Sequence, residues 1–261
     1  MRLKIIGLAL LGYSGMASSS TFMFDDIQDV DPAKQDGKWR ATAELGVLVR
    51  TGNTDSQSWK SKLDLQRDTE VWRNRAVIDY YLQERDSEDG TTVKDADRLF
   101  LSAQGNRKFD AGSHSSFFLY GSYEDDALNS FEYQSTVAAG YGARVDFNES
   151  MFTDFEIGPG YAYDKRRDTG ETEGSFIVRA AANYDWQISE TARFTQLVST
   201  EVGNDNTRSR AVSALTANLN SRLAMRLTLT LTHNSTVYEQ ASGRIPDKLD
   251  TETAVTLVYT F

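Results

Sequence analysis

The amino-acid sequence predicts an all-β protein, a transmembrane antiparallel up-and-down β-barrel of about twelve strands. Three observations predict it. From Trp39 onward, apolar and polar residues alternate with the period of a strand that has one apolar and one polar face. The alternating runs are about 11–17 residues long, whereas strands in soluble sheets average ~5–6 and a tilted strand crosses a bilayer in ~9–11. The connections alternate between short turns and longer polar loops, as they do in membrane barrels.

The N-terminal residues predict export. Arg2 and Lys4 precede a short apolar run, and small residues end the segment at Ala17, which is the order of a secretory signal peptide over residues 1–17. The run is too short to span a membrane. Residues 18–38 are rich in aspartate and have little periodicity, so we expect a flexible periplasmic segment. Residues 39–261 then form the outer-membrane barrel.

Eight of the expected strands show a clear alternation of their own. Apolar residues that alternate with polar ones are, in chain order, Leu45, Val47, Val49; Trp59, Leu63, Leu65; Ala76, Ile78, Tyr80, Leu82; Val137, Ala139, Tyr141, Ala143, Val145; Phe155, Ile157, Tyr161, Tyr163; Phe176, Val178, Ala180, Ala182, Tyr184; Leu227, Leu229, Leu231; and Val255, Leu257, Tyr259. The expected strands lie near residues 39–50, 57–68, 72–85, 95–109, 115–126, 131–147, 151–166, 174–187, 192–202, 208–220, 224–237 and 248–261.

Two expected strands are irregular, and a third contains proline. Phe117 and Phe118 occupy both parities of the fifth strand, and Leu197 opposes Val198 in the ninth. Pro159 lies inside the seventh strand, where it has no N–H for the ladder. Because glycines flank this proline, we expect a bulge or bend there rather than a strand break.

The connections predict the orientation in the membrane. The short ones, expected in the periplasm, are 69–71, 110–114, 148–150, 188–191 and 221–223, and the mostly longer ones, expected outside, are 51–56, 86–94, 127–130, 168–173, 203–207 and 238–247. An even number of strands then puts both termini in the periplasm. A soluble sandwich or lipocalin-like barrel would alternate too, but its two sets of connections are usually similar in length.

Aromatic residues near strand ends predict an interfacial girdle. Its expected members are Trp39, Trp59, Trp72, Phe109, Phe147, Trp186, Tyr259 and Phe261. The final strand, with alternate apolar residues and a terminal phenylalanine, resembles the C-terminal signature that the barrel-assembly machinery reads in outer-membrane proteins, so we expect that machinery as a partner.

The polar parity predicts a charged lumen. The expected lumen-lining residues are Lys60, Lys62, Asp64, Arg73, Arg75, Asp79, Arg144, Asp154, Glu156, Arg179, Asp185, Arg226 and Glu252, and Arg85, Arg98, Glu124, Asp146 and Asp250 share their parity. Eight strands nearly fill a barrel interior and sixteen leave an aqueous channel, so twelve lie between. The mixed charges are compatible with a salt-bridged, largely occluded interior or with a narrow channel for ions or small solutes.

Charged residues also gather at the expected outer ends of the strands. The chain carries 28 basic and 38 acidic residues, a net charge of -10, which argues against nucleic acid as a partner. The basic group that we expect to meet phosphates of outer-membrane lipids and lipopolysaccharide comprises Lys165, Arg166, Arg167, Arg208, Arg210, Arg244 and Lys248. The acidic outer loops suggest a surface receptor or adhesin as one alternative function.

Enzymatic residues are scarce. The chain has no cysteine and two histidines, which excludes thiolate chemistry and thiolate metal sites, and we expect no cofactor and no metal. His233 and Ser235 share the lipid-facing parity, an arrangement that resembles outer-membrane lipid hydrolases, in which a base activates a hydroxyl for ester attack. A third group that would orient the imidazole is not evident on the neighbouring strands. A lipid acyl hydrolase is therefore the weaker alternative, and we expect no enzyme.

Six short motifs carry a family resemblance. They are Glu44-Leu45-Gly46, Thr51-Gly52-Asn53-Thr54-Asp55, Tyr123-Glu124-Asp125-Asp126, Ala139-Gly140-Tyr141-Gly142, Gly158-Pro159-Gly160-Tyr161 and Leu257-Val258-Tyr259-Thr260-Phe261. In this order they resemble the YdiY-like family of Gram-negative outer-membrane proteins, often labelled salt-induced, whose domain has unknown function. The resemblance implies an outer-membrane β-barrel and no substrate or catalytic residue. We expect a narrow channel or an envelope-stress structural protein.

Overall fold

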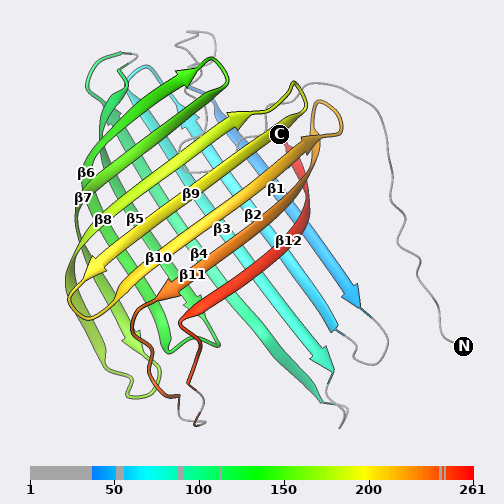
Figure 1. The fold of residues 1–261 in the computed structure, drawn as a ribbon, viewed down its shortest axis with the longest axis vertical. Coiled ribbons are helices and arrows are strands. Elements are labelled where there is room, and N and C mark those ends of the chain that lie inside the picture. Colours follow the sequence, from blue (N-terminus) through cyan, green and yellow to red (C-terminus); the bar gives the residue numbers. More distant parts are fainter. Residues whose placement is uncertain (1–36, 51–55, 87–90, 112, 241–242, 244) are drawn as a thin grey trace, which may run out of the picture.

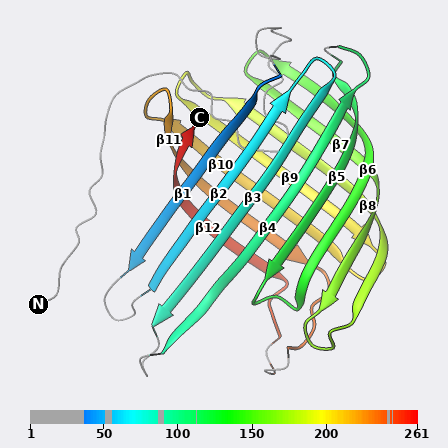
Figure 2. The same ribbon diagram turned by 180° about the vertical axis from the view of Figure 1, so that it is seen from behind.

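Twelve antiparallel strands close into one barrel, each pairing with its neighbours in the sequence and β12 pairing with β1 (Figures 1 and 2). The computed structural model describes residues 37–50, 56–86, 91–111, 113–240, 243 and 245–261. The strands are β1 (Trp39–Arg50), β2 (Ser56–Asp68), β3 (Trp72–Asp86), β4 (Thr92–Lys108), β5 (Ser115–Asp126), β6 (Phe131–Asn148), β7 (Met151–Arg166), β8 (Thr172–Gln187), β9 (Ala192–Gly203), β10 (Thr207–Asn218), β11 (Leu223–Asn234) and β12 (Leu249–Thr260). The predicted fold class is confirmed.

The strand bounds differ from the prediction mainly next to two of the outer loops. Strand β4 begins at Thr92, three residues early, because Asp86 pairs with Thr92 beyond a register shift at Gln83 and Glu84. Strand β11 ends at Asn234, three residues early, and the next two residues hydrogen-bond to the loop between β9 and β10. The predictions for residues 1–36 and 51–55, including the signal peptide, lie outside the described residues.

The barrel closes over a short seam. Strand β12 pairs with β1 between Thr42–Leu45 and Leu257–Thr260, four residue pairs, whereas β2 pairs with β3 over thirteen. The terminal Phe261 donates its N–H to the Ala41 carbonyl at 3.0 Å. The chain end therefore closes the barrel at the same rim as the short turns (Figure 1).

The outer face is apolar. Large apolar side chains exposed on it come from strands all round the barrel and include Leu45, Ile78, Leu119, Val137, Ile157, Val178, Val198, Leu215, Leu227 and Leu257. Soluble monomers rarely expose contiguous apolar patches of such extent, and a closed barrel leaves no sheet edge unpaired in lipid. Among the described residues, no helix is long and apolar enough to cross a membrane.

Strand β7 runs through Pro159 without a break, as predicted, but the predicted bulge is absent. Ala138 pairs with Gly160 and Tyr141 with Ile157, so the register between β6 and β7 is the same on both sides of the proline. The two strands instead approach closely. A Cβ added at Gly158 would lie 2.1 Å from the Ala139 carbonyl oxygen, and one at Gly140 would lie 2.2 Å from the Ile157 carbonyl oxygen. The two glycines therefore allow the backbones of β6 and β7 to approach closely next to Pro159, which has no N–H to donate to the ladder.

Candidate functional site: the lumen

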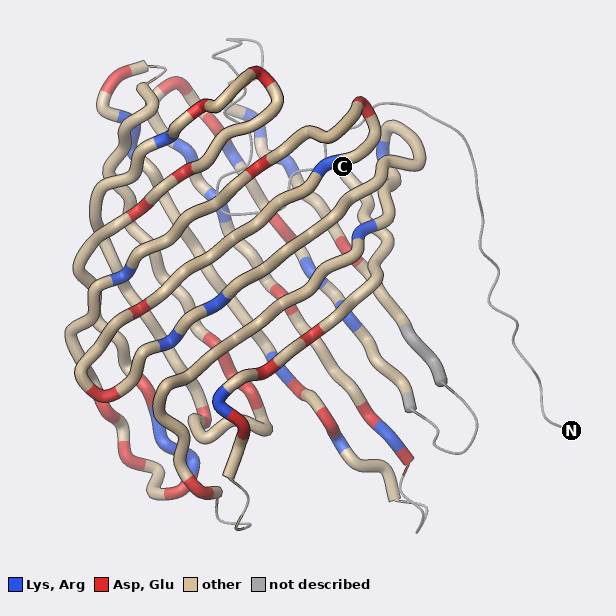
Figure 3. Tube along the Cα trace, viewed as in Figure 1, with Lys and Arg blue, Asp and Glu red and all other residues tan. Residues whose placement is uncertain are grey.

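The inner face carries the residues that the sequence assigned to the lumen. All thirteen, from Lys60 to Glu252, have side chains that are buried or nearly so inside a barrel whose outside is apolar. Figure 3 shows basic and acidic residues along the height of the strands as well as in the loops. Because successive side chains of a strand point to opposite faces of the sheet, the residues next to each of these charged residues face outward.

Near the short-turn rim, ion pairs join neighbouring strands. Arg144 on β6 donates to Asp154 on β7 at 2.7 and 2.9 Å, and Arg193 on β9 donates to Asp185 on β8 at 3.0 Å. Arg75 pairs in the same way with Asp64. These pairs line the wall and do not cross the lumen.

Deeper in the barrel, a carboxylate and two amides meet across several strands. Glu156 on β7 accepts hydrogen bonds from Gln104 at 2.7 Å and Asn106 at 3.2 Å, both on β4. Strands β4 and β7 are three steps apart in the ring. The sequence predicted Glu156 to line the lumen, but nothing in the alternation pairs it with these amides.

In the half with the longer loops, ion pairs span the lumen itself. Arg98 on β4 donates to Glu252 on β12 at 2.5 Å, and Glu252 also accepts from Lys60 at 2.6 Å. Glu124 on β5 pairs with both Arg208 and Arg210 on β10. These partners lie four and five strands apart in a ring of twelve, so the side chains cross the barrel interior. We call Arg98, Glu124, Arg208, Arg210 and Glu252 the crossing layer.

An aromatic contact reinforces the crossing layer. The Arg210 guanidinium lies over the Phe100 ring, 4.7 Å from its centroid, and these residues are on strands six apart, directly opposite each other. Arg179 on β8 lies over the Tyr120 ring on β5 at 4.0 Å. Cation–π contacts of this kind are strongest where water is excluded. Side chains from opposite walls therefore meet inside the lumen at this level.

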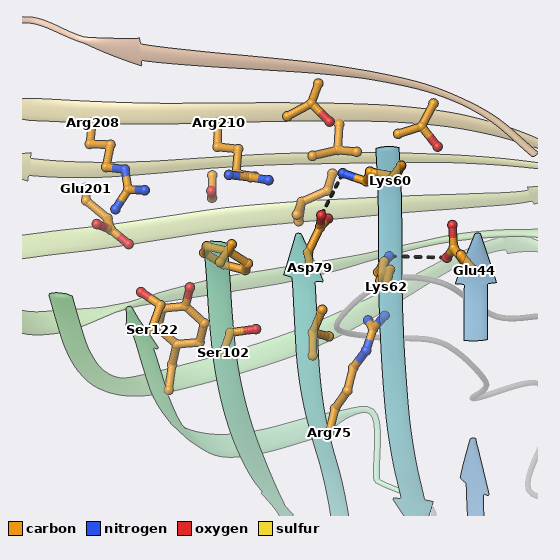
Figure 4. Close-up of a pocket in the computed structure, with 18 of the residues that line it drawn as sticks. Glu44, Lys60, Lys62, Arg75, Asp79, Ser102, Ser122, Glu201, Arg208 and Arg210 are labelled. Atoms are coloured by element: carbon orange, nitrogen blue, oxygen red, sulfur yellow. Dashed lines mark ion pairs between the residues drawn. The ribbon is translucent and has the colours of Figure 1, made fainter. Parts of the chain in front are cut away.

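A central cavity of about 70 Å³ adjoins the crossing layer (Figure 4). Its charged lining residues are Glu44, Lys60, Lys62, Arg75, Asp79, Arg179, Glu201, Arg208, Arg210 and Arg226, seven of which are basic. Its apolar wall comprises Val77, Phe100, Tyr120, Leu197 and Val212. In Figure 4, Arg208 and Arg210 point into the space from one wall, and Lys60 and Asp79 meet in an ion pair.

A second cavity, the outer vestibule, lies on the other side of the crossing layer. Its volume is about 160 Å³. Its charged lining residues are Asp95, Arg98, Glu124, Asp126, Asp247, Asp250 and Glu252, so acidic groups predominate there. Thr230 lines both cavities, and the layer of ion pairs lies between them.

The connection from β11 to β12 reaches across the mouth of the vestibule. The Tyr238 N–H donates to Ser130 Oγ at 2.7 Å, and Ser130 Oγ donates to the Tyr238 carbonyl at 2.9 Å. Gln240 donates to the carbonyls of Leu128 and Asn129, and the Arg166 guanidinium stacks on the Tyr238 ring at 3.7 Å. This connection is thus attached to the loop between β5 and β6, five strands away from β11.

The basic group predicted to meet lipid phosphates is divided. Arg208 and Arg210 lie in the lumen on Glu124, because even-numbered residues of β10 face inward. Arg166 pairs with Asp168 at 2.6 Å, and Lys165 pairs with Glu132 at 2.8 Å. Arg244 lies outside the described residues. The prediction for the two lumen arginines is wrong because their place at a strand end does not decide which face they occupy.

The aromatic residues predicted for the girdle are exposed on the outside. Most of them, including Trp39, Trp72, Phe147 and Trp186, lie at the end of the barrel that carries the short turns. The sequence did not single out an arc of aromatic contacts at the opposite end, formed by Tyr123, Tyr133, Tyr163 and by Tyr161 with Phe176. The rings of this arc stack from β5 across β6 to β7, and they meet only because of the register between these strands.

His233 and Ser235 are placed differently from each other. His233 is exposed on the outer face of β11, between Ser209 and Leu249 on the neighbouring strands. Ser235 follows the end of β11, where its hydroxyl donates to Asn206 Oδ1 at 3.2 Å and accepts the Thr207 N–H at 2.8 Å. The hydroxyl thus takes part in the link between two outer loops. Among the described residues, no cluster of three or more histidine, aspartate and glutamate side chains suits a metal ion.

A closed twelve-stranded barrel with an apolar outer face and a charged lumen is an outer-membrane β-barrel. Residues 43–261 match the family described as "Protein of unknown function, DUF481", and the chain belongs to that family. It is 27% identical over 261 residues to "Uncharacterized protein YdiY" of Escherichia coli (strain K12), and the match covers 98% of each chain. The predicted YdiY-like resemblance is confirmed.

Solved outer-membrane proteins are also similar at low identity. The translocator domain of the autotransporter NalP from Neisseria meningitidis is 14% identical, with a TM-score of 0.47 over 88% of this chain and 92% of that one. The KdgM porin in complex with disordered oligogalacturonate is 9% identical, with a TM-score of 0.45 over 85% of this chain and 99% of that one.

Proposed function

We propose that the protein is a narrow outer-membrane channel for small charged solutes, closed in the present conformation by the crossing layer. The observation that carries the proposal is the pair of cavities, about 70 and 160 Å³, separated by ion-paired side chains. Side chains can move without unfolding a strand, because rotamers interconvert far faster than backbone segments unfold.

The crossing layer is suited to such exchange. Glu124 accepts two arginines, and Glu252 accepts Arg98 and Lys60, so each carboxylate can release one cation and keep the other. A buried carboxylate without a partner would cost several kcal/mol. Because each carboxylate keeps one cation while it releases the other, the layer can open without passing through such a state. The cost of opening is lowered accordingly.

The proposal is tested by single-channel recording in planar bilayers. We expect brief, low-conductance openings for the wild type and a larger, longer-lived conductance for Glu124→Gln with Glu252→Gln, because the amides hold the arginines less strongly. Glu190→Gln, an exposed residue in the β8–β9 turn, removes one acidic charge away from the lumen and is the control. A folded double variant that stays silent would contradict the channel.

A structural role in the envelope is the second candidate. The same cross-lumen pairs join strands four and five apart and brace the barrel against deformation. In that case the double variant should unfold at a lower denaturant concentration and still conduct no current. The conductance of the double variant therefore distinguishes the two functions.

A further inference from the structure

The central cavity has a lining that is mainly cationic, although the chain as a whole is acidic. We propose that it binds a small monovalent anion, best a short-chain carboxylate such as acetate. Seven of its ten charged lining residues are basic. This inference deepens the proposed channel and rests on it for its role in transport, because an anion site on the path would select solutes. The binding itself can be tested without conduction.

Carboxylates around the cavity are shared. Glu44 pairs with both Lys62 and Arg226, Glu124 with two arginines, and Glu252 with Lys60 and Arg98. The basic side chains in these ion pairs are Lys60, Lys62, Arg75, Arg98, Arg179, Arg208, Arg210 and Arg226, and their acidic partners are Glu44, Asp64, Asp79, Glu124, Glu201 and Glu252. Among the ion pairs of the described residues, eight cations thus share six carboxylates, so basic groups outnumber acidic ones around the cavity.

Two buried donors in the lining have no acceptor among the described residues. They are Nη1 of Arg75, which is 6% exposed, and Nε of Arg179, which is 2% exposed. Besides its contact with the Tyr120 ring, Arg179 forms a long ion pair with Glu201, 3.4 Å between Nη1 and Oε1. A buried N–H without an acceptor costs about 1–3 kcal/mol, and more when it is charged. An anion in the cavity would supply the acceptors.

The rest of the lining limits the kind of anion. Val77, Phe100, Leu197 and Val212 form an apolar wall, which favours a ligand with an apolar end over a fully hydrated ion. The volume of about 70 Å³ is roughly half that of a cavity that holds benzene, ~150 Å³. A carboxylate with one or two further carbons meets both conditions, whereas a sugar acid is too large.

The inference is tested by isothermal titration calorimetry of the detergent-solubilised, folded full chain with sodium acetate. We expect saturable binding to the wild type and a loss of affinity of at least about tenfold in Arg179→Gln, since a charge-assisted hydrogen bond is removed. Glu201→Gln should bind acetate more tightly than the wild type, because it releases Arg179 from its carboxylate. Lys165→Gln makes the same charge change outside the cavity and should bind like the wild type.

No saturable binding to the folded wild type would overturn the inference, as would equal affinities for Arg179→Gln and Lys165→Gln. Sodium hexanoate should compete weakly, and tight competition by hexanoate would contradict the size argument. If bilayers stay silent while acetate binds, the proposed channel fails and the anion site stands.

Discussion

Adjacent residues in the middle of β11 provide a test of which face meets lipid. Leu229 is 38% exposed on the outer face, and Thr230, the next residue, is 5% exposed in the lumen. Leu229 lies six residues from the first residue of β11, which is about 20 Å along the strand and about 15 Å along the barrel axis at a tilt of ~40°. That depth is close to the middle of an apolar band ~25 Å tall.

We therefore expect Leu229→Arg to lower the free energy of unfolding by about 2–4 kcal/mol, the cost of arginine at the bilayer midplane. Thr230→Arg introduces the same side chain opposite Glu252, its partner in the register, and should cost less. Both variants gain the same arginine and the same charge, so they differ chiefly in the face that the arginine occupies.

The assay is reversible unfolding by guanidinium from phospholipid vesicles, followed by tryptophan fluorescence and by the mobility of the folded band in an unheated gel. Leu229→Ala measures the loss of apolar contact separately from the added charge. Equal destabilisation by Leu229→Arg and Thr230→Arg would refute the assignment of faces, since it would mean that both positions meet the same environment.

Three further predictions concern the lumen and the strands. The acidic vestibule and the basic central cavity should make the open-channel current rectify, with larger conductance when the outer side is positive. At that polarity cations in the vestibule and anions in the central cavity both move toward the boundary between the two cavities. A symmetric current–voltage curve would argue against this charge arrangement along the channel. Gly158→Ala should destabilise the barrel by about 1–3 kcal/mol, whereas Gly121→Ala, whose Cβ meets nothing nearer than 3.9 Å, should be tolerated in the same unfolding assay. Ser130→Ala removes both hydrogen bonds to Tyr238, so residues 235–248 should be cut faster in limited proteolysis, and an unchanged rate would show that other contacts hold this connection.

Much of the lumen was predictable from parity. In an antiparallel barrel the side chains of successive residues face opposite sides, so an apolar residue that meets lipid places its neighbours inside. This reasoning placed Asp64, Arg144 and Arg226 on the inner face, and all three are buried there. The same reasoning is less successful in β5 and β9, where the apolar residues Phe118 and Leu197 face inward.

The pairs that cross the lumen were not predictable in this way. Parity indicates that Glu124 and Arg208 face inward, but not that they meet. Their contact depends on the position of β5 and β10 in the ring, on the tilt of the strands and on the width of the barrel. These are properties of closure, and no short stretch of sequence encodes them.

The sequence by itself determined the strand number, the orientation of the faces and the placement of short turns at one rim, because the period-two alternation and the lengths of connections are local properties of the chain. Only the tertiary structure decided that charges from opposite walls join into a crossing layer, that a mainly basic cavity lies beside it, and that the β11–β12 connection reaches the loop between β5 and β6. The physical reason is that a twelve-stranded barrel is narrow enough for long side chains to meet across it, and that distance exists only once β12 has closed on β1.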